Sequence, residues 1–425
     1  MMISVFLGSL LGTMALGMPI AFALLFSGVA LMLYLDIFDS QIIAQNLING
    51  ADNFPLMAIP FFLLAGELMN AGGLSQRIVS MSMSLVGHIR GGLGYVAIMA
   101  SVLFASLSGS AVADTAAIGA ILIPMMVKSG YDINRSSGLV AAGGIIAPVI
   151  PPSIGFILFG VTSGVSITKL FMAGIVPGIL LGVSLIVAWA IVSRRDNVTV
   201  QPRKSAREIL KAFREGIWAL FLPAIIIFGL RFGVFTPTEA AVVAAVYALV
   251  VGLFIYRQLT VKDLYQVFIN AAKMTSVVMF LVAAALVSSW LITVANLPQE
   301  VIGLLEPFMD HPLLILLMIN LLVVIVGTAM DMTPTILILT PVLMPLVKAA
   351  GIDPVYFGVL FIINNAIGLL TPPVGTVLNV VCGVSKISME DIMKGVWPFL
   401  LAELIILILL ILFPSIVLVP LHWLT

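Results

Sequence analysis

Two clusters of small polar residues interrupt apolar stretches of the sequence, and each contains one acid. The first runs Ser106-Leu-Ser-Gly-Ser-Ala-Val-Ala-Asp-Thr115, and the second runs Gly327-Thr-Ala-Met-Asp-Met-Thr-Pro-Thr335. Glycine lets a chain turn tightly, freed amides at a helix N-terminus attract anions, and freed carbonyls can bind sodium. We therefore predict two re-entrant helical hairpins whose tips stop inside the membrane. The alternative is a pair of ordinary spans with a polar turn at the membrane surface.

A proline-broken segment follows each cluster. The first reads Gly143-Gly-Ile-Ile-Ala-Pro-Val-Ile-Pro-Pro-Ser153, and the second reads Asn364-Asn-Ala-Ile-Gly-Leu-Leu-Thr-Pro-Pro-Val-Gly-Thr376. A Pro-Pro pair removes two amide donors and leaves upstream carbonyls without helical partners. Unwound backbone at membrane depth survives only where it lines a cavity or is buried in protein. A bound cation would satisfy these oxygens, whereas the plainer alternative is a structural kink.

Three acids lie inside apolar stretches: Asp114, Asp331 and Glu67. An ionised carboxylate within the bilayer is costly, so such an acid is a functional candidate by default. Asp114 or Asp331 would instead cap a helix if it lay at the membrane surface, and Glu67 could pair with Arg77 or Lys128. No histidine or second carboxylate lies beside the polar clusters, and no metal-ligand spacing occurs. The sequence therefore does not indicate an enzyme or a transition-metal centre.

The composition places the whole chain in a membrane. Of its 425 residues, 62% are hydrophobic and 9% are charged, against roughly 25% charged in a soluble domain. Apolar segments recur near residues 3–33, 54–70, 92–127, 138–160, 168–192, 216–232, 238–256, 264–293, 312–349, 355–383 and 396–420. We predict one all-α polytopic membrane domain over residues 1–425, with about 11 transmembrane helices and two re-entrant hairpins. Because the net charge is zero, no nucleic-acid partner is expected.

Seven of the 19 basic residues fall in one short segment, residues 194–214. Cytoplasmic loops are enriched in Lys and Arg, so this segment is predicted to be a cytoplasmic connector. Arg257 and Lys262 return to the same side two crossings later. The apolar residues at helical spacing around its end are Ile209, Leu210, Phe213 and Ile217. They fit either a helix along the membrane surface or a simple solvated connector.

The second part of the sequence repeats the first at a fixed offset of 221 residues, with 11 identities over 57 ungapped positions. Its proline and glycine identities are Pro124/Pro345, Gly130/Gly351, Pro151/Pro372, Pro152/Pro373, Gly174/Gly395 and Pro177/Pro398. Apolar composition alone would not place these residue types in register. We predict one repeat over about 54–192 and another over about 265–420. Basic residues closely follow only the first, which predicts inverted orientations.

The motifs resemble one family of membrane proteins over essentially the whole chain. Gly109-Ser-Ala-Val-Ala-Asp-Thr115, Pro148-x-x-Pro-Pro-Ser153 and Asp331-x-x-Pro-Thr-x-x-Leu-x-Thr-Pro341 are similar to the large membrane subunit of the tripartite ATP-independent periplasmic (TRAP) transporters, the DctM-like permeases. Within that family, the pattern is similar to systems for sugar acids such as 2,3-diketo-L-gulonate. No Walker-type nucleotide motif is present, in agreement with an ATP-independent mechanism.

The resemblance implies a multi-pass protein of the bacterial inner membrane, working with a small four-span subunit and a periplasmic solute receptor. Sodium would drive uptake of an organic acid, a C4-dicarboxylate or sugar acid, without a cofactor. An elevator movement would carry a transport core, built mainly from residues 92–160 and 312–383, past a scaffold. A stand-alone sodium-coupled dicarboxylate or citrate carrier of similar design is the alternative. A channel is disfavoured, because paired hairpins suit a central site closed on alternate sides.

The resemblance also implies where ligands bind. Sodium would be bound near the hairpin tips and the facing broken helices, mostly by backbone carbonyls, at Ser108, Gly109, Ser110, Gly144, Pro148 and Ile150, and at Gly327, Asp331, Pro334, Gly368 and Thr371. The candidate substrate-binding residues are Ser108, Ser110, Asn364, Asn365 and Thr376. Ala111 stands where some members carry a polar side chain, a departure from the family pattern.

Overall fold

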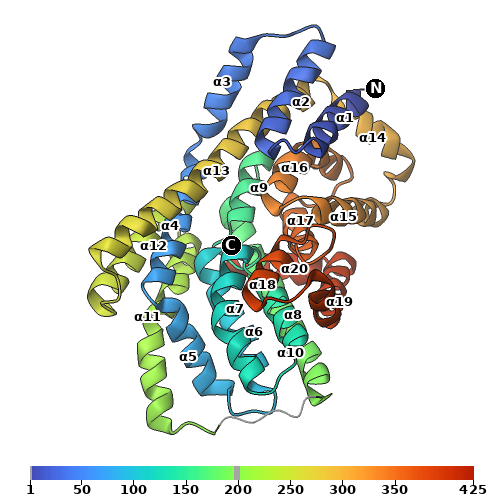
Figure 1. Ribbon diagram of the computed structural model, residues 1–425. Coiled ribbons are helices and arrows are strands. Elements are labelled where there is room, and N and C mark those ends of the chain that lie inside the picture. The colour runs from blue at the N-terminus through green and yellow to red at the C-terminus, as the bar shows by residue number, and fades with distance from the viewer. Residues whose placement is uncertain (1, 196–201) are drawn as a thin grey trace.

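The computed structural model describes residues 2–195 and 202–425, which form 20 α-helices, a few short helical turns and no strand (Figure 1). In chain order, the helices before the basic segment are α1 (Met2–Ala15), α2 (Ile20–Tyr34), α3 (Ser40–Ala51), α4 (Ala58–Ala71), α5 (Leu74–Val86), α6 (Gly92–Ser108), α7 (Ala111–Lys128), α8 (Ile133–Gly144), α9 (Ile154–Ser163) and α10 (Ile167–Val192). Those after it are α11 (Ala206–Arg231), α12 (Pro237–Val250), α13 (Val261–Val294), α14 (Leu297–Leu305), α15 (Pro312–Ala329), α16 (Met332–Ala349), α17 (Pro354–Gly368), α18 (Thr376–Ser385), α19 (Met389–Leu412) and α20 (Ser415–Leu424).

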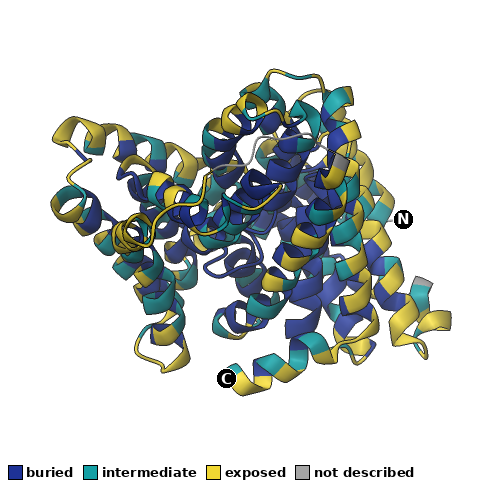
Figure 2. Ribbon diagram, turned by 90° about the horizontal axis from the view of Figure 1, so that it is seen from below, coloured by how far each residue is buried: buried dark blue, intermediate teal, exposed yellow. Residues whose placement is uncertain are grey.

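Nine helical stretches in the described ranges are long and apolar enough to cross a membrane. Several shorter apolar helices accompany them, including α9 from the first proline-broken segment and both α17 and α18 from the second. The prediction of an all-helical polytopic membrane protein is confirmed. Figure 2 shows the burial pattern that such a fold requires, with buried residues filling the interior of the helix bundle and exposed residues along its outer helices.

The first predicted apolar segment, residues 3–33, is divided into two helices. Gly17 adopts a left-handed φ of 84°, and Pro19 precedes the first residue of α2 with a φ of −58°. A left-handed residue ends an α-helix, and proline starts a new one without an amide donor. As a result α1 folds back against α2 (Figure 1), and neither alone has the length of a full span.

The two proline-broken segments behave alike. The predicted segment 138–160 consists of α8 and α9 joined by an irregular turn at residues 145–153. The predicted segment 355–383 consists of α17 and α18 joined at residues 369–375. Both turns contain the Pro-Pro pair, which cannot supply the amide hydrogen bonds that would continue a helix. In both turns, hydrogen bonds between residues three positions apart, such as those from the Ala147 amide to the Gly144 carbonyl and from the Thr371 amide to the Gly368 carbonyl, replace part of the regular helical pattern.

The helix boundaries follow the sequence repeat. The second helices of the two hairpins, α7 and α16, are each 18 residues long, and their first residues lie 221 positions apart. The first hairpin helices, α6 and α15, end 221 positions apart. Helices α9 and α18, and then α10 and α19, begin 222 positions apart. The same series of hairpin, broken helix and long helix thus occurs twice.

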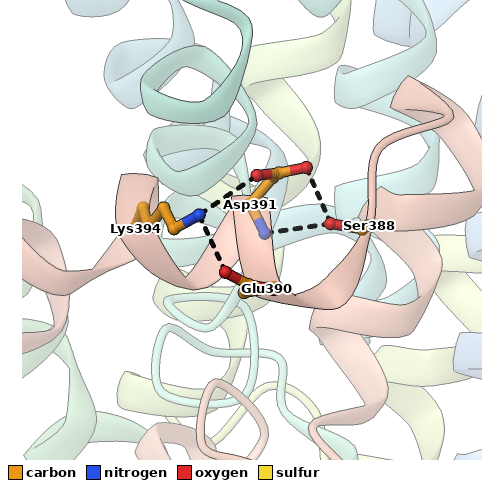
Figure 3. Close-up of polar contacts among 4 residues, drawn as sticks. All are labelled: Ser388, Glu390, Asp391 and Lys394. Carbon is orange, nitrogen blue, oxygen red and sulfur yellow. Dashed lines mark hydrogen bonds and ion pairs between the residues drawn. The ribbon is translucent and has the colours of Figure 1, made fainter.

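Serine caps begin the long helix in each series. Ser166 accepts a hydrogen bond from the Lys169 amide at 3.4 Å at the start of α10, and Ser388 accepts one from the Asp391 amide at 3.1 Å at the start of α19. Figure 3 shows the second cap, where Lys394 also pairs with Glu390 at 2.9 Å. Exposed pairs of this kind add little stability. The cap fixes where α19 starts after the broken helix.

Part of the predicted basic connector is helical. Helix α11 begins at Ala206 behind a capping box, in which Ser205 and Glu208 satisfy each other's backbone amides. Leu210 is 68% exposed on the first turns of this helix. The apolar stripe therefore belongs to the start of a continuous helix that runs to Arg231. Residues 196–201 of the predicted connector lie outside the described residues.

Candidate functional site

The first hairpin turns at Gly109. This residue has a left-handed φ of 62°, and a Cβ atom built on it would lie 2.5 Å from the Pro152 carbonyl oxygen. Only glycine combines that backbone conformation with such close packing. Ser110 then caps α7 by accepting a hydrogen bond from the Ala113 amide at 3.4 Å. The first tip is thereby held against the turn between α8 and α9.

Asp114 lies in the first turn of α7 and is 1% exposed. The Ser108 hydroxyl donates a hydrogen bond to its Oδ1, and the same hydroxyl oxygen accepts one from the Ser110 amide at 3.1 Å. The Oδ2 atom of Asp114 has no hydrogen-bond partner within the described residues. Half of this buried carboxylate is thus satisfied by the tip itself, and half is not.

The second hairpin turns at Met330 and Asp331. Asp331 occupies the N-cap position of α16, but its side chain makes no capping hydrogen bond. The Oδ1 atom instead accepts a hydrogen bond from the Thr376 hydroxyl at 3.2 Å, at the start of α18. The Val374 amide also donates to the Thr328 carbonyl at 3.1 Å. The second tip is thereby held against the turn between α17 and α18.

Close backbone contact supports the second tip. A Cβ atom built on Gly368 would lie 2.9 Å from the Gly327 Cα and 3.1 Å from the Gly327 carbonyl oxygen. Any side chain at either position would push α15 away from the end of α17. Glycine at both places therefore brings the hairpin next to the broken helix. A comparable pairing of tip and turn exists in the first half at Gly109.

Both tips open onto one large cavity of about 820 Å³. Gly109, Ser110 and Pro148 line it from the first series, and Asp331 and Thr333 line it from the second. The opposite wall comes from α4, α5 and α13, which contribute the polar side chains Glu67, Asn70, Ser75 and Gln76 and the apolar side chains Leu63, Met274 and Val278. Figure 1 shows α13 crossing the molecule beside α4 and α12. Segments far apart in sequence therefore enclose a single space.

The cavity walls combine anion-binding and cation-binding groups. Helices α7 and α16 both start at the cavity, and the positive ends of their dipoles favour a bound anion. The carboxylates of Glu67 and Asp331 and the carbonyls of the turns favour a cation. Among the described lining residues there is no Lys, Arg or His. The space is suited to an anion accompanied by a cation.

Glu67 does not pair with either base proposed from the sequence. Arg77 instead donates to the Gly73 carbonyl at 2.9 Å, and its guanidinium lies 3.7 Å from the centre of the Tyr256 ring. No ion pair of Glu67 occurs within residues 2–195 and 202–425. Glu67 therefore faces the cavity without a basic partner.

The predicted sodium ligands fall into two groups. Gly109, Ser110, Pro148 and Asp331 line the large cavity together, and Ser108 lines a small cavity beside it. Those outside the described walls of both cavities are Gly144, Ile150, Gly327, Pro334, Gly368 and Thr371. These residues pack behind the tips or within the turns. The sodium ligand set as a whole stays a prediction.

The predicted substrate-binding residues are also divided. Ser108 and Ser110 lie at the cavities, and Thr376 reaches the cavity through Asp331. Asn364 is fully buried and donates to the Asn320 carbonyl at 2.7 Å and to the Asn320 Oδ1 at 2.9 Å. Asn365 is 1% exposed and has no side-chain partner in the described ranges. Substrate contact by the two asparagines stays a prediction.

The sequence interpretation missed one feature of the site and one buried acid elsewhere in the fold. Asn70 and Gln76 supply polar groups to the cavity wall around the turn between α4 and α5, but neither carries a motif. Outside the walls of both cavities, Glu403 on α19 is fully buried, and neither of its carboxyl oxygens has a partner within the described residues. A signal for Glu403 was available, because it is a lone acid inside an apolar run.

Comparisons with known proteins agree on one family. The model of the "Tripartite ATP-independent periplasmic transporter, DctM component" matches residues 7–416. The chain is 59% identical over 423 residues to the 2,3-diketo-L-gulonate TRAP transporter large permease protein YiaN of Escherichia coli K12, covering 100% of both chains. It is 40% identical over 405 residues to the sialic acid TRAP transporter large permease protein SiaM of Vibrio cholerae, covering 95% of each. The YdaH transporter of Alcanivorax borkumensis shares the fold, with a TM-score of 0.60 at 14% identity over 88% of this chain and 87% of that chain.

Proposed function

This chain belongs to the family of DctM components of TRAP transporters, which are multi-pass permeases of the inner membrane. We propose that it is the translocating subunit of a sodium-coupled, receptor-dependent importer of a small organic acid. The observation that carries this proposal is the single cavity shared by both hairpin tips and the facing wall of α4, α5 and α13. A site built at the interface of two repeats is the arrangement that secondary transporters use.

Charge explains how sodium would be coupled to the substrate. The described cavity lining holds two acids and no base, so an organic anion entering alone meets net negative charge. A sodium ion bound by carbonyls of the turns and by Asp331 offsets that charge, and the N-termini of α7 and α16 then hold the carboxylate. Substrate binding thus becomes favourable only when sodium is bound, which is the thermodynamic basis of coupling.

The movement proposed is an elevator displacement of the transport core, residues 92–160 and 312–383, against the remaining scaffold. The core carries both hairpins and both broken helices, so the binding groups stay together as it moves. The cavity wall from α4, α5 and α13 stays behind with the scaffold. The site is open to one side of the membrane when the tips face one end of that wall, and to the other side when they face its other end.

The partners proposed are a small four-span membrane subunit and a periplasmic solute receptor. Support comes from the family description, which names a tripartite transporter with a periplasmic part. The substrate class proposed is a sugar acid, since the relative that is 59% identical over its full length is named for 2,3-diketo-L-gulonate. A carboxylate with several hydroxyl groups fits a wall that includes Asn70, Ser75 and Gln76.

The test is uptake of radiolabelled 2,3-diketo-L-gulonate by proteoliposomes that contain this chain and its small subunit. Four conditions are compared, with and without an inward sodium gradient and with and without purified receptor. We expect uptake only when both are present. The control variant Glu306→Gln, which changes an exposed acid that does not line the cavity, should behave like the wild type.

Two results would contradict the proposal. Equal uptake with sodium and with potassium would remove sodium coupling. Sodium-driven uptake that does not need the receptor would remove the tripartite mechanism and favour a stand-alone carrier. If the sugar acid is not taken up but a C4-dicarboxylate is, only the substrate class changes.

A further inference from the structure

A second, small cavity of about 30 Å³ lies between the first hairpin and α4. It is separate from the packed face of the tip, where Gly109 meets the Pro152 carbonyl. Gly66 brings α4 close, because a Cβ atom built on it would lie 3.4 Å from the Ser108 Cβ. The first hairpin is therefore enclosed between the turn after α8 on one side and α4 on the other.

The walls of this small cavity are rich in oxygen donors. Glu67 and Asn70 line it from α4, and Ser108, Ser110 and Asp114 line it from the hairpin. Asp114 is 1% exposed, and its Oδ2 atom has no partner among the described residues. The described lining contains two acids and no basic residue. An unpartnered carboxylate oxygen therefore borders a small space that a second carboxylate also faces.

Two carboxylates that face one small space inside the protein are stabilised either by a proton on one of them or by a cation between them. Leaving one ionised and unpaired in a low-dielectric interior is strongly unfavourable. A cavity of about 30 Å³ is also large enough for one water molecule or a small ion. Carboxylate, hydroxyl and amide oxygens are the ligands that hard cations prefer. The walls thus have the charge, the size and the donor type for one monovalent hard cation.

We propose that Glu67 and Asp114 hold a sodium ion between α4 and the first hairpin. This inference rests on the proposed sodium-coupled function and adds a site to it. The site differs from the carbonyl site predicted on the other face of the tip, with Gly144, Pro148 and Ile150. Its ligands come from two parts of the molecule that the elevator movement would separate. Sodium bound here therefore favours the state in which the hairpin lies against α4.

The structure also provides a route for exchange. Glu67 and Asn70 line the large cavity as well as a polar pocket of about 380 Å³, which Gln258, Asp263, Gln266 and Asn270 complete at the start of α13. The described lining of this pocket has acids and amides but no base. Such a surface concentrates cations and repels organic anions. Arg257 and Lys262 beside it predict that it faces the cytoplasm.

The test is equilibrium binding of ²²Na⁺ to the purified complex of this chain with its small subunit in lipid nanodiscs. The variants are Glu67→Gln and Asp114→Asn, with Glu306→Gln as the matched control on an exposed acid. Glu67→Gln keeps the size and hydrogen bonding of the side chain and removes only the charge. We expect it to lower the sodium stoichiometry by about one ion, or to weaken one class of site roughly tenfold or more.

The outcomes separate this inference from the proposed function. Wild-type uptake without any sodium dependence would remove the proposed function. Wild-type sodium dependence together with unchanged ²²Na⁺ binding by both variants would overturn only the site between α4 and the hairpin. Asp114→Asn is interpreted only if its melting temperature in sodium-free buffer matches the wild type, whereas Glu67→Gln remains informative because its side chain is half-buried at the cavity edge.

Discussion

The two hairpin units of this transporter share a backbone plan but exchange the positions of their polar side chains. In the first unit, the broken helix carries Gly143 and Gly144, and the hairpin supplies the polar groups. A Cβ atom on Gly144 would lie 1.7 Å from the Thr115 Oγ1, and one on Gly143 would lie 2.5 Å from the Ser101 Oγ. The hydroxyls of the hairpin therefore fill the space beside two glycines.

In the second unit the relation is reversed. The residues 221 positions later are Asn364 and Asn365 on the broken helix, and Leu322 and Ile336 on the hairpin. At these four equivalent positions the polar side chains come from the broken helix and the apolar ones from the hairpin, although Asn320 on α15 supplies a polar partner for Asn364. Buried polar groups at this contact occur in both units. The two units differ in the helix that contributes these polar side chains. A substitution on the broken helix of one unit is therefore tolerated only with a complementary residue on the hairpin of the same unit.

The tips differ in where they place charge. Ser110 and Asp331 are equivalent N-cap positions of α7 and α16, whereas Asp114 corresponds to Thr335. The second tip therefore presents its acid to the large cavity. The first tip buries its acid next to Ser108 and the small cavity facing α4. The two acids of the hairpins should serve different steps of transport.

Replacement of the cavity acid of the second tip should have the largest effect. We expect Asp331→Asn to raise the sodium concentration for half-maximal uptake by roughly a hundredfold, because truncating a charge in a desolvated site costs several kcal/mol. The measurement is uptake as a function of sodium in proteoliposomes. Asparagine still suits an N-cap position, so expression should be unchanged. Normal sodium activation would remove Asp331 from the ion site.

The second-largest effect is expected when Gly144 in the first unit is replaced by alanine, which should destabilise the protein. Gly144→Ala forces the Thr115 hydroxyl out of its place, and overpacking of this kind costs roughly 1–3 kcal/mol. The measurement is the melting temperature of the purified complex. The double variant Gly144→Ala/Thr115→Ala should recover most of the loss. If it recovers nothing, the two residues do not share the space that the structure assigns to them.

The asparagine pair of the second unit should matter for stability rather than for substrate affinity. Asn364→Leu leaves Asn320 without its donor, at a cost of roughly 1–3 kcal/mol for an unsatisfied buried group. Asn320→Leu should cost a similar amount, and the double variant should cost less than the sum. Melting temperatures of the four proteins check this. A raised KM with an unchanged melting temperature would instead place Asn364 at the substrate.

Loss of the serine cap in the first tip should have the smallest effect. Ser110→Ala removes the cap of α7, typically worth about 1 kcal/mol. Because the tip is also held by the Pro152 contact, we expect a melting temperature lowered by only about one degree. Sodium activation should shift far less than in Asp331→Asn. A shift of equal size in the two variants would mean that the two caps have the same role.

The sequence carried strong signals for the elements of the fold. Gly109 and Ser110, and then Asp331 and Pro334, marked the hairpin tips, because turn and cap residues are rare within apolar runs. The Pro-Pro pairs marked the broken helices for the same reason. These signals depend only on neighbouring residues in the sequence, so they can be interpreted without knowing how the helices pack.

The arrangement of the cavity walls could not be read in the same way. Glu67 and Asp114 face one small cavity from different helices, and their approach depends on Gly66 and on the rotation of α4. Helix rotation is fixed by packing against several neighbours rather than by a motif. For the same reason no motif indicates that the Asn364 side chain turns toward Asn320 instead of toward the cavity.

The most direct test of the central claim is a disulfide between the scaffold and the first hairpin. Gly66→Cys and Ser108→Cys fit such a bond, since the 3.4 Å between their Cβ positions is close to the roughly 3.5–4.5 Å that a disulfide spans. The single native cysteine, Cys382, is replaced by alanine. Sodium-driven uptake is then measured before oxidation, after oxidation and after reduction.

Because Ser108 donates to Asp114, the Ser108→Cys variant alone sets the reference rate, and the oxidant should leave that rate unchanged. Relative to this reference, we expect oxidation of the double variant to abolish uptake and reduction to restore it. That result would show that the hairpin must leave α4 during each transport cycle. Full uptake by protein in which the cross-link has been verified would contradict the elevator movement of the hairpins past the scaffold.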